Sequence, residues 1–511
     1  EEVFHRVLGP HDLWVLRVES GADVVSWIKS YASKQGLKVP AWLSNVEATI
    51  QGYVDRGYRY LAVDVVTLAG EGDVKPLMYR FSSKYAYYPL EVSKLAMEFD
   101  GGPILFFENV EGKKVVVNVC GSRDRICLAL KSRRQDLHRK LVTSMHYLRT
   151  PEVVDSAPSQ EEVEKPDLGD IPILTHFEKD GGPYITSGVI YARSSKLGVE
   201  NVSIHRLQVL DDSTLAIRLV PRHLYKLWMA HKLEKKHLEV SISVGVHPAV
   251  HLAAASSPPF GVNEFHIANS LLAGELKLVK CLKVDAYAPA EAELIIEGII
   301  SWEREALEGP LVDILGTYDV QRMQPIVEVK AVTHRKDYVY QAIVPSSMEH
   351  KLLMGLPREA LIWEAVSKVV PEVYGVRLTM AGGGWLHAVV SIRKQREGDG
   401  KNALLAALAA HPSLKHVVVV DEDIDVYDSE AVEWAIATRF QADRDLIVVK
   451  DVRGSTLDPS SDQERVLTSK VGVDATKPMD KPKEKFEPAT IPSTSRVEGL
   501  IESLRKRLAI R

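Results

Sequence analysis

Cysteine is scarce in this sequence. The 511-residue chain contains Cys120, Cys127 and Cys281, and none of them belongs to a CxxC pair. An odd and scattered set of cysteines excludes a disulfide framework and fits a reducing cytosol. We expect the three side chains to be small apolar residues rather than reactive thiols.

Long apolar runs and an excess of charge of one sign are also absent. No run approaches the roughly 20 residues that span a bilayer, and residues 1–8 lack the basic-then-apolar pattern of a signal peptide. The 64 Lys and Arg are interspersed with 69 Asp and Glu, which gives a net charge of −5. We therefore expect a cytoplasmic protein with no integral membrane segment and no nucleic-acid partner.

Two segments look like known binding motifs but lack the spacing that defines them. Gly382-Gly383-Gly384 precedes a predicted strand rather than a helix, which excludes a dinucleotide or P-loop fingerprint. The DEDID segment at 421–425 lacks the spacing and glycine of an EF-hand. It is better interpreted as the solvated end of a strand.

The sequence pattern does change along the chain, and it predicts an α+β protein of several domains. We expect an N-terminal α/β domain at 1–150 and a strand-rich central domain, a β-barrel or closed sandwich, at 171–335. An α/β domain at 345–452 follows, and then an extended arm with a terminal helix at 453–511. Prolines among acidic residues mark 150–170 as a linker or exposed loop.

Periodicity predicts the individual elements. Helices are expected at 24–36, 223–233, 359–370, 403–410 and 430–438. Strands are expected at 60–66, 104–107, 115–119, 189–191, 202–210, 215–220, 240–246, 292–300, 326–332, 387–392, 416–420 and 446–449.

The C-terminal region combines a polar arm with an amphipathic helix. Residues 453–493 are rich in Asp, Pro, Lys and Ser, and Ser495 with Glu498 forms a capping box. An apolar stripe follows, made of Val497, Leu500, Ile501, Leu504 and Leu508. Such a helix docks either on a neighbouring subunit or on its own chain, and we expect a homodimer or a larger homo-oligomer.

Several polar residues could carry chemistry. Asn201 and Arg206 lie five apart on a predicted strand and so point to opposite faces, unless a bulge intervenes. His223 stands at a strand-to-helix junction, where helix N–H groups attract phosphate. Glu264 follows a Ser- and Pro-rich loop. Asn, His and carboxylate groups suit Mn²⁺ or Mg²⁺, although each residue taken alone is better explained as an exposed or structural residue.

A Gly-Pro turn separates two further acids, Glu308 and Asp313. Two carboxyl groups held close together acquire different pKa values, so that one can stay protonated at neutral pH. An arginine nearby would hold the other ionised. This pair is a candidate general acid, although surface turns often carry acids.

Taken in order, longer motifs resemble those of the UbiD family of prenylated-FMN-dependent decarboxylases, from about residue 106 to the end of the α/β block. The resemblance rests on FENVEG (107–112), NVCGSRDR (118–125), IPILTHFEKDGGPYITSG (171–188), GVHPAVHLAAASSPPFGVNEF (245–265), LVKC (278–281), VVVVDEDIDVYDSEAVEWAIATR (417–439) and SKVGVDAT (469–476). It implies a split β-barrel that binds the flavin at 171–335.

The resemblance also implies roles for individual residues. Asn201, His223 and Glu264 match the family's Mn²⁺ ligands, and Glu308, Arg206 and Asp313 match its catalytic acid–arginine network. Asp313 or Glu308 would protonate the carbon that loses CO₂, with the flavin as electron sink. The implied cofactor contacts, with K⁺ as an additional ion, are Asn201, Ile204, His205, Arg206, Arg222, His223, Ser256, Ser257, Glu264 and Lys415.

The resemblance implies an unsaturated carboxylic acid as substrate and a UbiX-like flavin prenyltransferase as cofactor supplier. The first candidate is trans-anhydromevalonate 5-phosphate, converted to isopentenyl phosphate in the archaeal mevalonate pathway, with Arg222, Lys226 and His205 as cations for its phosphate. A cinnamic-type acid is disfavoured because the ferulic acid branch has Gln at the Arg222 position. Alternatives are an aromatic acid such as a hydroxybenzoate, a non-catalytic flavin-binding protein, and an ordinary metal hydrolase.

Overall fold

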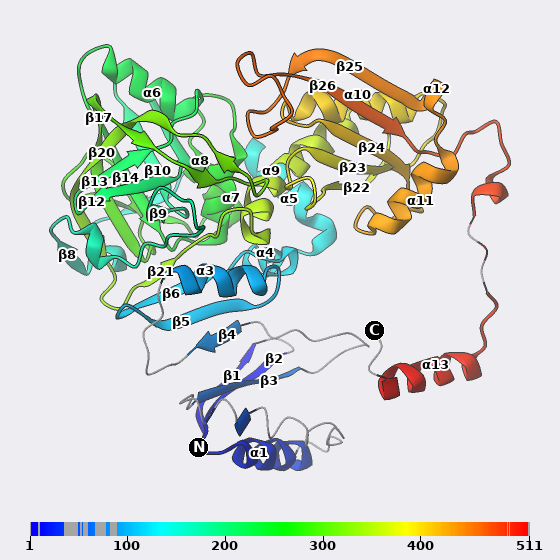
Figure 1. The fold of residues 1–511 in the computed structure, drawn as a ribbon, viewed down its shortest axis with the longest axis horizontal. Helices are drawn as coiled ribbons and strands as arrows, with labels where there is room; N and C mark the ends of the chain where they lie inside the picture. Colours follow the sequence, from blue (N-terminus) through cyan, green and yellow to red (C-terminus); the bar gives the residue numbers. More distant parts are fainter. Residues whose placement is uncertain are drawn as a thin grey trace.

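Two long paired strands, β17 (Leu294–Glu308) and β20 (Arg322–His334), lie at the centre of the largest sheet in the computed structural model (Figure 1). The structure describes residues 89–487 without a gap. Outside that range it describes 2–8, 11–34, 50, 51, 54, 60–66, 78–81, 489 and 491–508.

The central sheet is a curled sheet that is split along one line. Its strand order is β11-β10-β14-β17-β20-β13-β12-β9, with β8 paired to β20. Strands β11 and β12 follow each other in the chain but lie apart in this order, so the two residues between them, His205 and Arg206, cross the split. The remaining strands are β8 (Glu162–Glu164), β9 (Tyr184–Ile185), β10 (Val189–Ser194), β11 (Val199–Ile204), β12 (Leu207–Asp211), β13 (Thr214–Ile217) and β14 (Leu238–Val244).

Alternating side chains of this sheet pack into two separate cores. Ile190 and Ile242 belong to the interior core of the barrel, whereas Val189 and Tyr191 face outward. The outward residues pack with Phe265 on α8 (Glu264–Leu271) and with α7 (Pro248–Ser256). A third helix, α6 (His223–Lys232), covers β10 and β17.

The N-terminal region contributes two smaller sheets. Strands β4 (Met78–Phe81), β5 (Ile104–Val110) and β6 (Lys113–Val117) form a sheet with β21 (Val339–Gln341). Strands β1 (Glu2–Leu8), β2 (His11–Arg17) and β3 (Tyr60–Val66) form another. The helices of this region whose bounds the structure describes include α1 (Gly21–Lys34), α3 (Pro89–Glu98), α4 (Arg123–Ala129) and α5 (Leu137–His146).

Short strands connect the larger units. In the segment expected to be a linker, β7 (Glu152–Val154) pairs with β15 (Lys277–Lys280), which also pairs with β16 (Tyr287–Pro289). Strand β18 (Leu311–Val312), which lies between Glu308 and Asp313 in the segment called the acid turn, pairs with β19 (Tyr318–Asp319).

The C-terminal sheet has the order β22-β23-β24-β26-β25. The 20-residue helix α9 (Met348–Ser367) leads into it and packs against α5 and α7, so it lies between this sheet and the barrel (Figure 1). The elements are β22 (Val373–Leu378), β23 (His387–Ile392), α10 (Asp399–Ala410), β24 (His416–Asp421), α11 (Ser429–Arg439), α12 (Ala442–Asp445), β25 (Leu446–Arg453) and β26 (Leu467–Asp474).

Two element predictions are wrong. The strand predicted at 202–210 is two strands, because the chain crosses the split of the barrel at His205 and Arg206. The arm predicted from residue 453 begins too early, because β26 is an inner strand of the C-terminal sheet. Its buried positions are Lys470, Gly472 and Asp474, so the apolar alternation that reveals a strand is inverted.

Other predictions are confirmed. Strands 60–66 and 387–392 have the predicted bounds, and the helix expected near 495 is α13 (Ser495–Leu508), which stands apart from the C-terminal sheet at the end of an extended segment (Figure 1). The three cysteines are free and buried. In the part of the chain that the structure describes, no helix is long and apolar enough to cross a membrane.

Candidate active site

The guanidinium of Arg206 is the centre of the acid network. Arg206 Nε donates to Glu308 Oε1 at 2.9 Å, and Nη2 donates to Glu308 Oε2 at 3.1 Å. The Glu308 side chain is completely buried and that of Arg206 is 12% exposed. Burial alone would lower the pKa of Arg206, but the surrounding carboxylates raise it. The pair is therefore a fixed, bidentate ion pair.

Asp313 is held more loosely by the same arginine. Arg206 Nη1 lies 3.4 Å from Asp313 Oδ2, and the other carboxylate oxygen accepts the Ile314 N–H at 2.6 Å. The Asp313 side chain is 24% exposed. The structure therefore brings Arg206, Glu308 and Asp313 together, with Glu308 locked and Asp313 able to reach a ligand.

A third carboxylate joins this network, and the sequence did not reveal it. Arg206 Nη2 donates to Asp319 Oδ2 at 3.0 Å, and Arg322 Nη1 donates to Asp319 Oδ1 at 2.6 Å. Arg218 Nε lies 3.6 Å from Asp319 Oδ2. Burial would raise the pKa of Asp319, but Arg322 and Arg206 outweigh it and lower that pKa. The short pairing of β18 with β19 brings Asp319 to Arg206, a contact that no spacing rule predicts.

The acid turn is fastened to segment 180–184 through Gln208. Gln208 Oε1 accepts the Gly309 N–H at 2.9 Å, and its Nε2 donates to the Gly181 carbonyl at 2.7 Å. A Cβ on Gly181 would lie 2.4 Å from the Gly309 carbonyl oxygen, which leaves no room for any other residue. Tyr184 donates its hydroxyl to Glu308 at 3.2 Å. The KDGGPY part of the motif at 171–188 thus holds the turn that carries Glu308 and Asp313 in place.

Asn201, His223 and Glu264 also converge, from three different elements. Asn201 lies on β11, His223 is the first residue of α6, and Glu264 is the first residue of α8. Glu264 Oε1 accepts from Asn201 Nδ2 at 2.9 Å and lies 4.0 Å from His223 Nδ1. Turning the Asn201 amide over would direct its oxygen toward the same point.

The surroundings of Glu264 fit a bound cation. The carboxylate is 2% exposed, and its salt-bridge partner among the described residues is His223 alone. Burial raises the pKa of Glu264, although His223 and the Val202 N–H oppose this. A divalent ion at this point would compensate the buried charge. No three His, Cys, Asp or Glu side chains in the described ranges could hold a metal, so the triad depends on the Asn201 amide.

The N-terminus of α6 fits the phosphate of a flavin. Its N-cap residue, Arg222, makes no side-chain capping bond, so the first N–H groups of the helix are available to an anion. His205 is one of the two residues that cross the split between β11 and β12. Its Nδ1 is 2.8 Å from the Arg218 carbonyl, and burial lowers its pKa to about 4. His205 is therefore a neutral group that cannot serve as a cation for a phosphate near neutral pH.

The remaining predicted contacts lie in two places. Ser256 donates to the Ala253 carbonyl at 2.7 Å, and Ser257 caps the end of α7 in the left-handed region, with φ of 49°. Ile204 packs beside the α7–α8 core at the end of β11. Lys415 Nζ instead binds Asp458 at 2.8 Å.

Lys470, within the SKVGVDAT motif, was not among the site residues predicted from the sequence. It is 6% exposed and donates to the Pro412 carbonyl at 2.7 Å. Lys470, Arg358 and Arg222 all lower the pKa of His411, after burial as the main cause, so the three cations lie around one imidazole. Lys470 could have been identified from its position within the SKVGVDAT motif.

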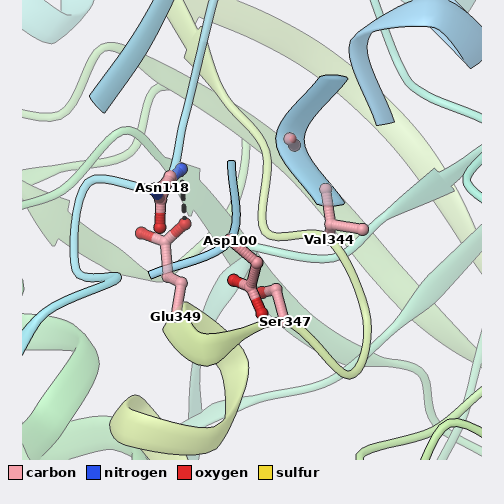
Figure 2. Close-up of a pocket in the computed structure, with 6 residues that line it drawn as sticks. Asp100, Asn118, Val344, Ser347 and Glu349 are labelled. Carbon is pink, nitrogen blue, oxygen red and sulfur yellow. Dashed lines mark hydrogen bonds between the residues drawn. The ribbon is translucent and has the colours of Figure 1, made fainter. Parts of the chain in front are cut away.

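The start of α9 is fixed beside the acid turn. Ser346 Oγ donates to the Ile314 carbonyl at 3.1 Å. Glu349 accepts the Asn118 N–H at 2.9 Å and the Cys120 N–H at 2.7 Å, and Figure 2 shows its carboxylate directed at Asn118. The NVCGSRDR motif at 118–125 therefore anchors α9, and with it every residue that α9 contributes.

Comparison with known proteins covers all three main parts of the chain. Residues 89–145 match the N-terminal domain of the 3-octaprenyl-4-hydroxybenzoate carboxy-lyase family, UbiD. Residues 152–348 match its Rift-related domain, and residues 351–475 match its C-terminal domain.

Named relatives and solved structures agree with this match. Anhydromevalonate phosphate decarboxylase from Methanothermobacter thermautotrophicus is 47% identical over 71% of this chain and 86% of its own length. The enzyme of the same name from Aeropyrum pernix is 45% identical over 79% and 91%.

Among solved structures, the UbiD-class enzyme HmfF from Pelotomaculum thermopropionicum in complex with FMN has a TM-score of 0.79. It is 41% identical, over 82% of this chain and 95% of HmfF. The fold, the acid network and these relatives lead to one conclusion: the chain belongs to the UbiD family of carboxy-lyases.

Proposed function

We propose that this protein is a prenylated-FMN-dependent decarboxylase of trans-anhydromevalonate 5-phosphate, which it converts to isopentenyl phosphate and CO₂. The observation that carries the proposal is the Arg206 network, in which one locked and one looser carboxylate share a guanidinium. The relatives named anhydromevalonate phosphate decarboxylase, at 44–47% identity, support the choice of substrate.

The two carboxylates take different roles in this reaction. Glu308 is bound bidentately and buried, so it fixes the orientation of Arg206. Arg206 in turn attracts the carboxylate of the substrate. Asp313 is more exposed and more weakly bound, so it donates the proton to the carbon that has lost CO₂.

The remaining site residues would bind the cofactor and the metal ion. Prenylated FMN, when bound, supplies the electron sink for the electron pair of the breaking C–CO₂ bond. Asn201, His223 and Glu264 would hold Mn²⁺, and the N-terminus of α6 would hold the flavin phosphate. The loop at Ser256 and Ser257 would contact the same phosphate and K⁺. A UbiX-like prenyltransferase would supply the flavin in the cytoplasm.

An aromatic acid is the second candidate substrate. A gallate decarboxylase from Lactiplantibacillus plantarum is 33% identical over 76% of this chain. Solved 3,4-dihydroxybenzoic acid decarboxylases reach a TM-score of 0.76 at 28% identity. These proteins share the fold but are less similar to this chain than the archaeal relatives.

The function is tested with protein co-expressed with a flavin prenyltransferase. We expect a flavin absorbance spectrum and the release of CO₂ and isopentenyl phosphate from trans-anhydromevalonate 5-phosphate. Protein without the flavin should be inactive, which also tests for a plain metal hydrolase. Turnover of gallate or 4-hydroxybenzoate with none of the phosphorylated acid would overturn the choice of substrate.

Assembly into a homodimer or a larger homo-oligomer is part of the proposal. The part of the α13 stripe whose side chains the structure describes is exposed, with Val497 at 43% and Leu500 at 59%. The stripe would be covered by a second copy of the chain, and an evolved dimeric form of HmfF is known among the similar structures. Light scattering of the full chain, compared with Leu500→Glu, tests this expectation, and a monomeric wild type would contradict it.

A further inference from the structure

Arg358 is a buried arginine without a carboxylate partner among the described residues. Its side chain lies on α9, and the residue is 9% exposed. Nη2 donates to Ser257 Oγ at 2.8 Å, the guanidinium lies 5.6 Å from the centre of the Trp385 ring, and Nε has no hydrogen-bond partner. A buried charge of this kind is costly unless a ligand of opposite charge compensates it.

The neighbours of Arg358 increase the positive charge instead of neutralising it. Burial, and then the charge of Arg222, lowers the pKa of Arg358 to about 10. Burial, and then Arg453, lowers the pKa of Arg222. His411 lies near both arginines and near Lys470, and its pKa falls to about 3, chiefly through burial. This cationic cluster, Arg222, Arg358, Arg453 and Lys470, therefore has the charge that a dianion requires.

The position of Arg358 on α9 relates the cluster to the reacting carbon. His350, Met354 and Arg358 follow each other at intervals of four, so they share one face of the helix. His350 Nε2 lies 3.1 Å from Met354 Sδ. His350 Nδ1 accepts the Ser346 N–H at 3.1 Å, and Ser346 Oγ donates to the carbonyl of Ile314, the residue after Asp313, at 3.1 Å, so this face of α9 begins beside Asp313.

The length of the substrate matches this arrangement. Eight residues of helix separate His350 from Arg358 by about 12 Å. Six bonds of an extended chain, from the carboxyl carbon to the phosphorus, cover about 7 Å. Long side chains on a helix lean toward its N-terminus. The guanidinium of Arg358 therefore lies closer to His350 than the backbone of Arg358 does, which brings the separation of about 12 Å nearer to the length of the substrate.

We propose that Arg358 binds the phosphate group of the substrate, with Ser257 orienting its guanidinium and Arg222 supplying a second positive charge. The inference rests on the proposed function, since it requires a phosphorylated substrate. A planar guanidinium can give two parallel N–H bonds to a phosphate monoester. The orphaned Nε of Arg358 would provide one of them.

A phosphate monoester at this place could come from the substrate or from the flavin. The substrate is favoured because the face of α9 that carries Arg358 begins beside Asp313, the proposed proton donor. The flavin phosphate has candidate partners of its own next to the Asn201, His223 and Glu264 triad, namely the free backbone N–H groups in the first turn of α6, whereas the Arg222 side chain acts on Arg358. The two sources give different results in the experiment.

The test uses Arg358→Gln and Arg358→Lys in flavin-loaded protein. Loss of two charge-assisted hydrogen bonds should raise KM for trans-anhydromevalonate 5-phosphate roughly 100-fold in Arg358→Gln. Values of kcat and flavin absorbance should stay close to those of the wild type. Arg358→Lys should recover only part of the affinity, because it keeps the charge and loses the fork. Trans-anhydromevalonate without the phosphate should show little change in KM.

Binding and stability provide readouts that do not depend on turnover. Calorimetry should show that the wild type binds isopentenyl phosphate but not isopentenol, and that Arg358→Gln loses this preference. Arg358→Gln should melt at the same temperature as the wild type or higher, because it removes an unpaired buried charge. Arg304→Gln removes an exposed arginine that pairs with Glu328, and it serves as the charge-matched control.

The outcomes are separable. Unchanged KM and unchanged binding of isopentenyl phosphate in Arg358→Gln would overturn the inference. Loss of flavin from that variant would also overturn it, because Arg358 would then belong to the cofactor. A wild type that never turns over the phosphorylated acid would overturn the proposed function, and the calorimetric comparison would still decide whether Arg358 binds a phosphate monoester.

Discussion

Two neighbouring residues of α9, Arg358 and Glu359, show opposite ways of burying a charge. Glu359 accepts from Arg123 at 2.9 Å, from His138 at 3.0 Å and from the Leu378 N–H at 2.8 Å. Arg358 has one hydrogen bond, to a hydroxyl, and no counter-charge among the described residues. The paired charge holds the N-terminal region to α9, whereas the unpaired charge is available to a ligand.

The same contrast separates the two charged clusters of the site. Around Arg206, three carboxylates meet three arginines, and each of them has a partner. Around Arg358 the charges have one sign. A fully paired cluster keeps its geometry without substrate, and that precision is needed where a proton is transferred. A cluster of one sign lowers stability and gains affinity for an anion.

Breaking the paired cluster at its centre should have the largest effect. Arg206→Gln leaves Glu308 buried without its ion pair, which should destabilise the protein by roughly 3–5 kcal/mol. Turnover should fall at least about 10³-fold, because the acids lose their positions. Urea unfolding and CO₂ release measure the two effects. A variant of normal stability and activity would show that the pairing around Arg206 is incidental.

Glu359 should make stability depend on acid pH. Burial alone would raise the pKa of Glu359, but Arg123 and His138 outweigh it and hold that pKa at about 2, against 4.5 for a free side chain. A depressed pKa stabilises the folded state above pH 4.5 and ceases to do so as the pH falls toward 2. The loss is roughly 3 kcal/mol. Between pH 4.5 and 2, the free energy of unfolding should depend less on pH in Glu359→Gln than in the wild type. The same dependence on pH in both proteins would contradict the assignment.

Asp319 tests whether the third carboxylate of the Arg206 network affects the reaction rate. Asp319→Asn removes the charge that binds Arg206, Arg218 and Arg322 together. We expect kcat to fall about tenfold with flavin content unchanged, because Arg206 loses one charge-assisted bond. Asp319→Glu should restore part of the rate. Equal rates for wild type and Asp319→Asn would confine Asp319 to a structural role.

The smallest effects distinguish two lysines, Lys470 on β26 and Lys415 immediately before the paired strand β24. Lys470 belongs to the cationic cluster, whereas Lys415 is neutralised by Asp458. We expect Lys470→Ala to raise KM for the phosphorylated substrate severalfold, because the cluster loses one charge, and Lys415→Ala to leave KM nearly unchanged. Steady-state kinetics measure KM, and the ratio of flavin to protein absorbance shows whether either variant loses the cofactor. Loss of flavin from Lys415→Ala would support Lys415, the residue expected from the sequence, as the cofactor contact.

Sequence reasoning reached those residues that match the family's functional positions once its ordered motifs were found. Asn201, Glu264 and Glu308 were identified in this way, and the structure brings Asn201 to Glu264 and Glu308 to Arg206. The opposite-face conflict between Asn201 and Arg206 disappears, because β11 ends at Ile204 before Arg206 is reached.

Residues whose role depends on tertiary contacts were missed. Asp319 meets Arg206 through the pairing of two-residue strands. Arg358 lies inside an ordinary helical pattern, and only its burial and missing partner distinguish it from a surface arginine. Strand β26 was missed because its buried face carries Lys470, Gly472 and Asp474 in place of apolar residues.

The central claim is that the paired cluster performs the chemistry and the unpaired cluster binds the phosphate. Steady-state kinetics of Asp313→Asn beside Arg358→Gln, both loaded with flavin, test it most directly. We predict that Asp313→Asn lowers kcat by roughly 10²–10⁴-fold with little change in KM, and that Arg358→Gln raises KM with little change in kcat. The same pattern of kcat and KM in both variants would contradict the division of roles.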